Sequence, residues 1–318
     1  MLDFLYYNMI LMIDGRTDII QYYSQWLENR FNEGFLYTRN PAYPTKVHKI
    51  LLDHDHIDAI MFTSKNFIPG MELIKKLDKE YPCLYHYTIT AYEKDIEPGV
   101  PDYVSRVANI KELSSIVGKE KVFWRYDPVL LTDKYNLLYH QAAFRISCSC
   151  FGSYINRCIY SYVNLYEKTK RHMPELEPWT DSKKRQVAVV LGQEAQYYGI
   201  PIQTCNCNLD LTEYGVGKSG CITKEIITNV LGLNVKDKKP NGSLGCGFCY
   251  PVVNIGEYNT CMNKCKYCYA SSDFRACEDN FNKHDPNSPY LIGNGTRYDE
   301  IVEYKNYSIL SNELNLFD

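Results

Sequence analysis

The stretch Ile57-Asp58-Ala59-Ile60-Met61-Phe62-Thr63 is followed by Ser64-Lys65-Asn66 and then by a helical stretch that begins at Pro69. The first stretch is mostly apolar and does not alternate between apolar and polar residues, which is typical of a strand buried on both faces of a parallel sheet. The helix expected at residues 69–80 carries its proline in the first turn, where the missing N–H needs no partner. This β-α unit therefore predicts a parallel sheet covered by helices.

Further short runs of the same kind occur on both sides of this unit. They occupy residues 9–13, 84–90, 121–126, 158–163 and 201–204. Helical stretches at residues 18–31, 102–117, 134–150 and 180–198 separate them. Six successive β-α units joined by right-handed crossovers predict an α/β fold of the TIM type, a (β/α)6-like partial barrel.

The organisation of the chain changes after the last of these units. Beyond Leu211 the regular alternation stops, and residues 205–290 contain most of the 13 cysteines. We therefore expect two parts: a β/α barrel at residues 1–210, with an inserted hairpin at 35–52, and a cysteine-rich region at 211–318. The second part is expected to form a cap that lies on the barrel mouth and carries a cluster loop.

Three of the cysteines form the motif CxxxCxxC. Cys261, Cys265 and Cys268 lie in one short segment, and Tyr267 directly precedes the third. Three thiolates can hold three irons of a cubic 4Fe–4S cluster and leave the fourth iron open to a small chelating cofactor. S-adenosylmethionine (SAM) binds in this way through its amino and carboxylate groups in radical enzymes. The alternative is a zinc knuckle, which would need a fourth ligand. Candidates for that ligand are Cys249, Cys277 and His284.

Four other cysteines form a second candidate metal site. These are Cys205, Cys221, Cys246 and Cys249, of which the last two form a CxxC pair. Four thiolates would make a closed site for zinc or for an auxiliary iron–sulfur cluster. The alternative interpretation is a set of reduced, partly buried cysteines without a metal.

Polar side chains follow the predicted strands at their carboxyl ends, where active sites of parallel β/α folds lie. In a SAM-binding site, Asp or Asn would bind the ribose hydroxyls, Arg would pair with the methionine carboxylate, and an aromatic ring would hold the adenine. Each residue also has a structural alternative, such as a helix cap or an ion pair between neighbours. The candidate cofactor-binding residues are Arg16, Asp18, Asn66, Thr90, Arg125, Asp127, Asn164 and Tyr267.

Composition limits the classes of partner and compartment. The formal net charge of the 318-residue chain is −3, so we expect no nucleic-acid partner. The apolar stretch at residues 2–13 is too short to span a bilayer, and we expect no membrane partner. An odd number of cysteines in a chain of this size argues against a secreted disulfide scaffold and favours a reducing cytoplasm.

Several ordered segments resemble an uncharacterised bacterial and archaeal family. The C-terminal cysteine cluster of that family is similar to the N-terminal cluster of radical-SAM enzymes. The family pattern leads us to expect Arg or Ser at Gly15, Asp at Asn164, and CxC in place of the pair Cys246 and Cys249. The matching segments are Arg16-Thr17-Asp18-Ile19, Ser64-Lys65-Asn66, Trp124-Arg125-Tyr126-Asp127-Pro128, Gly220-Cys221-Ile222, residues 255–261, residues 265–270 and residues 284–289.

The resemblance implies a radical-SAM enzyme whose cluster loop has moved to the C-terminal part of the chain. Such an enzyme cleaves SAM reductively at a 4Fe–4S cluster, and the 5′-deoxyadenosyl radical takes hydrogen from a small-molecule substrate. Lyases of queuosine salvage, which split queuine to release a 7-deazaguanine precursor, look similar. The implied cofactors are the cluster, SAM and a second cluster or zinc. The implied partner is a one-electron donor such as a flavodoxin or ferredoxin.

Two other functions remain open on the sequence. One is a zinc-stapled barrel that binds a ligand or nucleic acid without radical chemistry. The other is a zinc hydrolase, which needs an open coordination position and a nearby acid–base group. His54-Asp55-His56 is the one closely spaced histidine pair, and it lies in a polar segment that we interpret as solvated surface.

Overall fold

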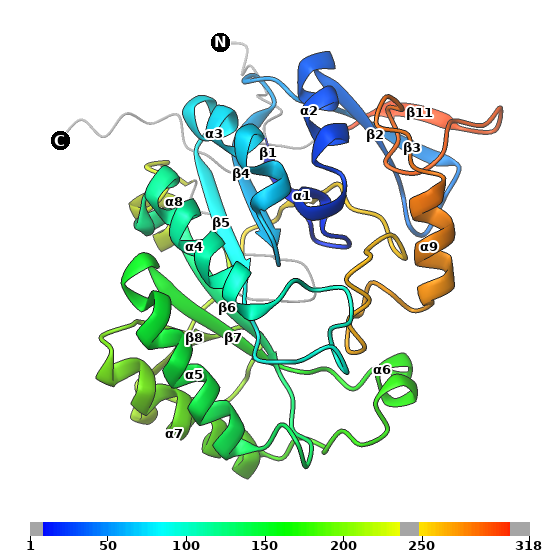
Figure 1. The fold of residues 1–318 in the computed structure, drawn as a ribbon. Helices are drawn as coiled ribbons and strands as arrows, with labels where there is room; N and C mark the ends of the chain where they lie inside the picture. The colour runs from blue at the N-terminus through cyan, green and yellow to red at the C-terminus, as the bar shows by residue number, and fades with distance from the viewer. Residues whose placement is uncertain (1–8, 236–247, 306–318) are drawn as a thin grey trace.

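A computed structural model of the chain describes residues 9–235 and 248–305 (Figure 1). Its centre is an eight-stranded sheet in the order β10-β1-β4-β5-β6-β7-β8-β9, in which every neighbouring pair is parallel. The strands are β1 (Met9–Ile13), β4 (Ile57–Ser64), β5 (Cys83–Thr88), β6 (Val122–Val129), β7 (Arg157–Tyr162), β8 (Ile202–Thr204), β9 (Val216–Lys218) and β10 (Val253–Asn254).

Helices follow most of these strands and cover the sheet. They are α1 (Ile19–Tyr22), α2 (Ser24–Glu33), α3 (Met71–Glu80), α4 (Tyr103–Val117), α5 (Leu137–Phe151), α6 (Glu167–His172), α7 (Asp181–Tyr197), α8 (Lys224–Asn229) and α9 (Phe274–Asn282). In Figure 1, α3, α4, α5 and α7 lie along one side of the sheet. No described helix is both long enough and apolar enough to cross a membrane.

A second, smaller sheet lies beside the first. It contains β2 (Phe35–Arg39), β3 (Lys46–Leu51) and β11 (Glu300–Glu303), in the order β11-β3-β2. β2 and β3 pair antiparallel, and β11 pairs parallel with β3. Arg39 binds both carboxylate oxygens of Asp299, at 2.8 and 2.9 Å. This bidentate pair joins the hairpin to a segment 260 residues further along the chain.

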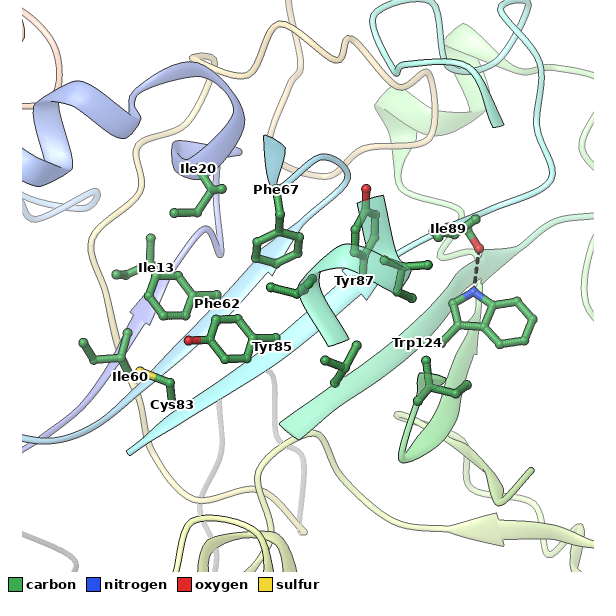
Figure 2. Close-up of a cluster of buried hydrophobic side chains, with 14 of the residues drawn as sticks. Ile13, Ile20, Ile60, Phe62, Phe67, Cys83, Tyr85, Tyr87, Ile89 and Trp124 are labelled. Carbon is green, nitrogen blue, oxygen red and sulfur yellow. Dashed lines mark hydrogen bonds between the residues drawn. The ribbon is translucent and has the colours of Figure 1, made fainter. Parts of the chain in front are cut away.

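The larger core lies between the sheet and helices α2, α3, α4, α5 and α7. Figure 2 shows part of it, where the rings of Phe62 and Tyr85 stack with centroids 5.2 Å apart. The indole N–H of Trp124 donates a hydrogen bond of 2.8 Å to the carbonyl of Ile89. These residues alternate along their strands with others that face the opposite way, as the pleat of a strand requires.

The opposite face of the sheet has a core of its own. Ile10, Met61, Leu84 and Phe123 point to this side, and Ile226 of α8 packs among them. In a closed barrel this face would line the interior and strands would complete the enclosure. Here the helix α8 and neighbouring segments cover it instead.

The predicted TIM-type (β/α)6 partial barrel is therefore wrong. The sheet is open and has eight strands, and within the described residues its edge strands β9 and β10 pair with one neighbour each and not with one another. All six expected runs do form strands of this sheet. The error arose because a buried parallel strand has the same apolar pattern in an open sheet as in a barrel.

Candidate functional site

A cavity of about 750 Å³ lies at the carboxyl ends of the parallel strands. Its lining comes from the segment after β1, the ends of β4 and β6, and the residues that follow β7 and β8. Parallel strands present all their carboxyl ends at one edge of a sheet, so side chains from distant positions in the sequence meet there. We call this space the strand-end cavity, and its volume is that of a small-molecule site.

The segment 261–268, which we call the cysteine loop, forms one wall of the strand-end cavity. Cys261, Cys265 and Cys268 all line it. The first two are buried and the third is half-buried. The CxxxCxxC motif thus presents its three thiols to one enclosed space, beside the strand ends.

Asn263 fixes the cysteine loop to the end of β1. Its side-chain N–H donates to Asp18 Oδ2 at 3.1 Å, and its side-chain oxygen accepts from the hydroxyl of Tyr22 at 3.0 Å. Its carbonyl accepts from the backbone N–H of Gly99 at 3.0 Å. Asn263 is buried, so each of these bonds satisfies a polar group that water does not reach.

Gly99 leaves no room for a side chain beneath the cysteine loop. A Cβ at this position would lie 2.1 Å from the carbonyl oxygen of Met262 and 2.8 Å from Cα of Asn263. Both atoms belong to the backbone, so Gly99→Ala must displace the loop. We expect the free energy of unfolding to fall by about 1–3 kcal/mol, measured by urea denaturation.

Gly217→Ala is the matched control for this substitution. A Cβ at Gly217 would meet its nearest atoms at 3.6 Å, which is ordinary van der Waals contact. Its effect on stability is expected to stay within about 0.5 kcal/mol. Equal effects of the two substitutions would show that the contact between Gly99 and the loop is unimportant.

A buried polar network supports the other end of the cysteine loop. Glu97 Oε1 accepts hydrogen bonds from Lys65 Nζ at 2.8 Å, from Thr90 Oγ1 at 2.7 Å and from the hydroxyl of Tyr267. Glu97 is buried, and burial raises its pKa, but the charges of Lys65 and Arg106 and these hydrogen bonds together hold that pKa below its ordinary value. The carboxylate therefore stays charged and ties the loop to β4 and to the segment after β5.

Asp18 and Asp14 form a pair of buried carboxyl groups at the end of β1. Asp18 accepts from Ser64 Oγ at 2.6 Å and from the backbone N–H of Lys65 at 2.9 Å. Asp14 has a φ of 92°, which is strained for a residue with a side chain. Burial raises the pKa of both groups, and the charge of Asp18 raises that of Asp14 further.

Asp14 also has an unused hydrogen-bonding atom in the strand-end cavity. Its Oδ1 accepts from the backbone N–H groups of Ile19 and Ile20, whereas Oδ2 has no hydrogen-bond partner among the described residues. A buried polar atom without a partner is rare in folded proteins. Asp14 also lines the strand-end cavity, which makes it a candidate ligand-binding residue.

Arg125 carries positive charge into the same cavity. Its Nε donates to Asp127 Oδ2 at 3.0 Å, and its Nη1 lies 2.7 Å from the sulfur of Cys221. Arg125 and Asp127 thus form an ion pair, which was the structural alternative to a cofactor-binding role for these two residues. Arg16 instead donates to the carbonyl of Gly256 at 3.2 Å.

The predicted cofactor-binding residues divide into two groups by position. Those that line the strand-end cavity are Arg16, Asp18, Arg125, Asp127, Asn164 and Tyr267. Thr90 does not line the cavity and instead donates a hydrogen bond to Glu97 in the buried network. Asn66 Oδ1 accepts from the backbone N–H of Ile68, so its side chain caps the turn before α3.

Sequence reasoning missed Asp14, Glu97 and Asn263. Asp14 and Gly15 directly follow the first predicted strand, and that position could have identified the aspartate as a strand-end residue. Glu97 lies in an irregular segment after β5, and Asn263 lies between two motif cysteines. Neither has a periodic or spacing signal in the sequence.

The second candidate cysteine set also meets at the strand-end cavity, as far as the structure describes it. Cys205, Cys221 and Cys249 line the cavity, and Cys246 lies outside the described residues. Within residues 9–235 and 248–305, no three His, Cys, Asp or Glu side chains are placed to hold a single metal ion. A single ion needs its ligands around one centre, whereas a cubic cluster takes each thiolate on a different iron.

Glu257, just before the cysteine loop, predicts a dependence of stability on pH. Burial raises its pKa from 4.5 to about 7, against the opposing charges of Arg39 and Arg16. The folded state therefore holds a proton that the unfolded state loses first. The contribution of this proton to the free energy of unfolding is fully present below about pH 4.5 and is lost as the pH rises through about 7.

We expect Glu257→Gln to remove this dependence. Between about pH 5 and pH 8, the wild-type free energy of unfolding should fall by about 1–3 kcal/mol more than that of the variant. Urea denaturation at the two pH values measures the difference. Glu303→Gln, at an exposed position of β11, serves as the control and should follow the wild type. Parallel curves for wild type and Glu257→Gln would contradict the expectation.

The fold and site define an α/β protein with an open parallel sheet and a cysteine-lined cavity at its strand ends. Residues 10–270 match the family described as a domain of unknown function (DUF1848), and the chain belongs to that family. The matched region runs from β1 through the whole cysteine loop. No curated protein and no solved structure matches the chain.

Proposed function

We propose that this protein is a radical-SAM enzyme. The observation that carries the proposal is the meeting of the three CxxxCxxC thiols with buried carboxyls and arginines in one strand-end cavity. Cysteine loop and strand ends are held together by Asn263 and Glu97, so the cavity is a built site. Its volume suits a ligand the size of SAM together with a small substrate.

The thiols fit a 4Fe–4S cluster. Cys261, Cys265 and Cys268 would hold one iron each, leaving one iron without a protein thiolate. Burial raises the pKa of Cys261 and of Cys265, so these thiols keep their protons until metal displaces them. When bound, the cluster supplies one electron that splits SAM into methionine and the 5′-deoxyadenosyl radical, which takes hydrogen from the substrate.

The remaining cavity residues would bind and orient SAM. Arg16 and Arg125 supply positive charge for its carboxylate. Asp14 and Asp18 supply partners for its ammonium group or ribose hydroxyls, and Asp14 Oδ2 has no hydrogen-bond partner among the described residues. Each of these side chains already makes hydrogen bonds within the protein, so little ordering is needed on binding.

Queuine is the first substrate that we propose, in a lyase reaction that releases a 7-deazaguanine precursor. Its flat ring system suits an aromatic lining, because rings stack on aromatic side chains. The tyrosines that line the cavity are Tyr162, Tyr166, Tyr250, Tyr258, Tyr267, Tyr269 and Tyr304.

We also propose a reducing compartment and a one-electron donor as the partner of this enzyme. The twelve described cysteines form no disulfide with one another, which suits the reducing cytoplasm. In the cell, a flavodoxin or ferredoxin would supply the electron. In the test below, dithionite takes its place.

Anaerobic reconstitution with iron and sulfide, followed by SAM and dithionite, tests the function. We expect a brown protein that forms 5′-deoxyadenosine, and addition of queuine should yield a 7-deazaguanine product. A colourless protein that retains zinc alone and leaves SAM intact would support the alternative, a zinc-stapled ligand-binding protein, and would overturn the proposal.

A further inference from the structure

Two cysteines of the strand-end cavity lie unusually close together. The sulfurs of Cys205 and Cys221 are 3.4 Å apart. Cys205 directly follows β8, and its backbone N–H donates to the carbonyl of Tyr160 at 2.8 Å. Cys221 follows β9 in a loop that Gln203 holds through a 2.9 Å hydrogen bond to the carbonyl of Gly220. A backbone hydrogen bond at Cys205 and the side chain of Gln203 beside Cys221 thus hold the two sulfurs close together.

A cation lies against one of these sulfurs. Arg125 Nη1 is 2.7 Å from the sulfur of Cys221, and the same guanidinium is held in place by Asp127. A neighbouring arginine favours the thiolate, which is the reactive form of cysteine. The same positive charge opposes the binding of a metal cation at this sulfur.

The third cysteine of the group has a different position. The sulfur of Cys249 accepts the backbone N–H of Cys221 at 3.1 Å, and Cys249 is buried. Cys205 and Cys221 are each half-buried and line the cavity, so a ligand can reach both sulfurs. The pair therefore combines contact between the sulfurs, a cation and access.

We propose that Cys205 and Cys221 form a redox-active dithiol that reduces a disulfide-bearing small molecule entering the strand-end cavity. Cys221 is the attacking thiol and Cys205 the resolving thiol. This activity does not depend on the function proposed above, because it requires neither SAM nor an iron–sulfur cluster.

The reaction proceeds by two exchanges. The Cys221 thiolate attacks one sulfur of the substrate disulfide, the S–S bond breaks, and a mixed disulfide forms as the first thiolate leaves. Cys205 then gives up its proton and attacks the Cys221 sulfur, which releases the second thiolate. The substrate gains two electrons and takes up two protons, and the protein is left with a Cys205–Cys221 disulfide.

Glutathione disulfide is the probe for the test. The full chain is reduced, freed of reductant and exposed to the probe under anaerobic conditions, and the remaining thiols are then alkylated and mapped by mass spectrometry. We expect two molecules of glutathione released per chain and a disulfide between Cys205 and Cys221. The assay is run before and after reconstitution with iron. Failure to bind iron can then be distinguished from failure of the dithiol to react with glutathione disulfide.

Three variants assign the roles. Cys205→Ser should release one glutathione and keep the other bound to Cys221 as a mixed disulfide. Cys221→Ser should slow the first exchange at Cys205 by at least about tenfold, since the thiolate beside Arg125 is gone. Cys158→Ser, a buried thiol of β7, is the control and should behave as the wild type.

Other results would overturn the proposal. These are a disulfide that joins Cys221 to Cys249 or Cys207, no exchange at either sulfur, or one zinc per chain that is lost in Cys205→Ser, Cys221→Ser and Cys249→Ser alike. A persistent Cys205–Cys221 disulfide in Cys249→Ser would support it. Each outcome is read from peptide masses and metal content, without an activity assay for SAM.

Discussion

Cys265→Ala is expected to abolish the cleavage of SAM while the chain still folds. Cys265 is the middle thiol of the CxxxCxxC motif and lines the strand-end cavity. Removing residues that merely support metal ligands typically lowers activity about 10–100-fold, so removal of a ligand itself should lower 5′-deoxyadenosine formation by more than about 100-fold. The measurement is chromatography of 5′-deoxyadenosine after anaerobic reconstitution.

The fold should survive this substitution because the hydrogen bonds that join the cysteine loop to Asp18 and Glu97 do not use the Cys265 sulfur. The backbone carbonyl of residue 265 accepts from the backbone N–H of Cys268 at 3.0 Å, and alanine keeps that bond. Asn263 and Tyr267 keep their hydrogen bonds to Asp18 and Glu97. An unchanged circular dichroism spectrum and unfolding midpoint would confirm that the loss is chemical.

Cys277→Ala is the matched control. Cys277 is fully buried in α9 and does not line the cavity. A cluster on the three motif cysteines does not need it, so SAM cleavage should persist. A zinc knuckle that used Cys277 as its fourth ligand would lose its metal in this variant. SAM cleavage that survived in Cys265→Ala would rule out the assigned cluster.

Trp124→Ala is expected to lower the free energy of unfolding more than the other substitutions described above. Trp124 of β6 is fully buried. Its ring stacks on Phe144 of α5 with centroids 4.7 Å apart and meets Phe151 edge-on at 4.9 Å. Removal of the indole leaves a large cavity between sheet and helix and an unpaired carbonyl on Ile89 (Figure 2). We expect the free energy of unfolding to fall by about 3–5 kcal/mol.

Urea denaturation followed by circular dichroism measures this effect, with Trp124→Phe as a graded variant. Phenylalanine keeps most of the ring packing but cannot donate to Ile89, so its loss should be about 1–3 kcal/mol. Trp179→Ala, at a half-buried position, should cost less than Trp124→Ala. A Trp124→Ala protein as stable as the wild type would show that this contact between β6 and α5 contributes little.

The sequence predicts the central strands well because each is a continuous apolar run. Residues 57–63, for example, coincide with most of β4 (Ile57–Ser64). The closure of the sheet is not predictable in this way. β9 and β10 have three and two residues, which is too short for a pattern, and β10 pairs with β1 across 242 positions. Local periodicity carries no information about such pairing.

The candidate site is likewise predictable from the sequence only in part. Spacing identified Cys261, Cys265 and Cys268, and position at or just after the end of a predicted strand identified Asp18 and Arg125. All five line the strand-end cavity. The residues that hold these side chains in place could not be identified from the sequence. Glu97 and Asn263 matter because of what they touch, and those contacts join segments 32 to 245 positions apart. Only the folded chain brings them together.

The bond between Asn263 and Asp18 has a consequence for biosynthesis. The two residues leave the ribosome 245 positions apart. A chain grows at about 5–20 residues per second, so Asp18 waits on the order of ten seconds or longer for its partner. During that interval the successive β-α units can already assemble, since each contacts its neighbour in the sequence. The wall of the cavity that carries the cysteines thus forms after these β-α units, and the proposed cluster could be loaded only once the strands of the large sheet have left the ribosome.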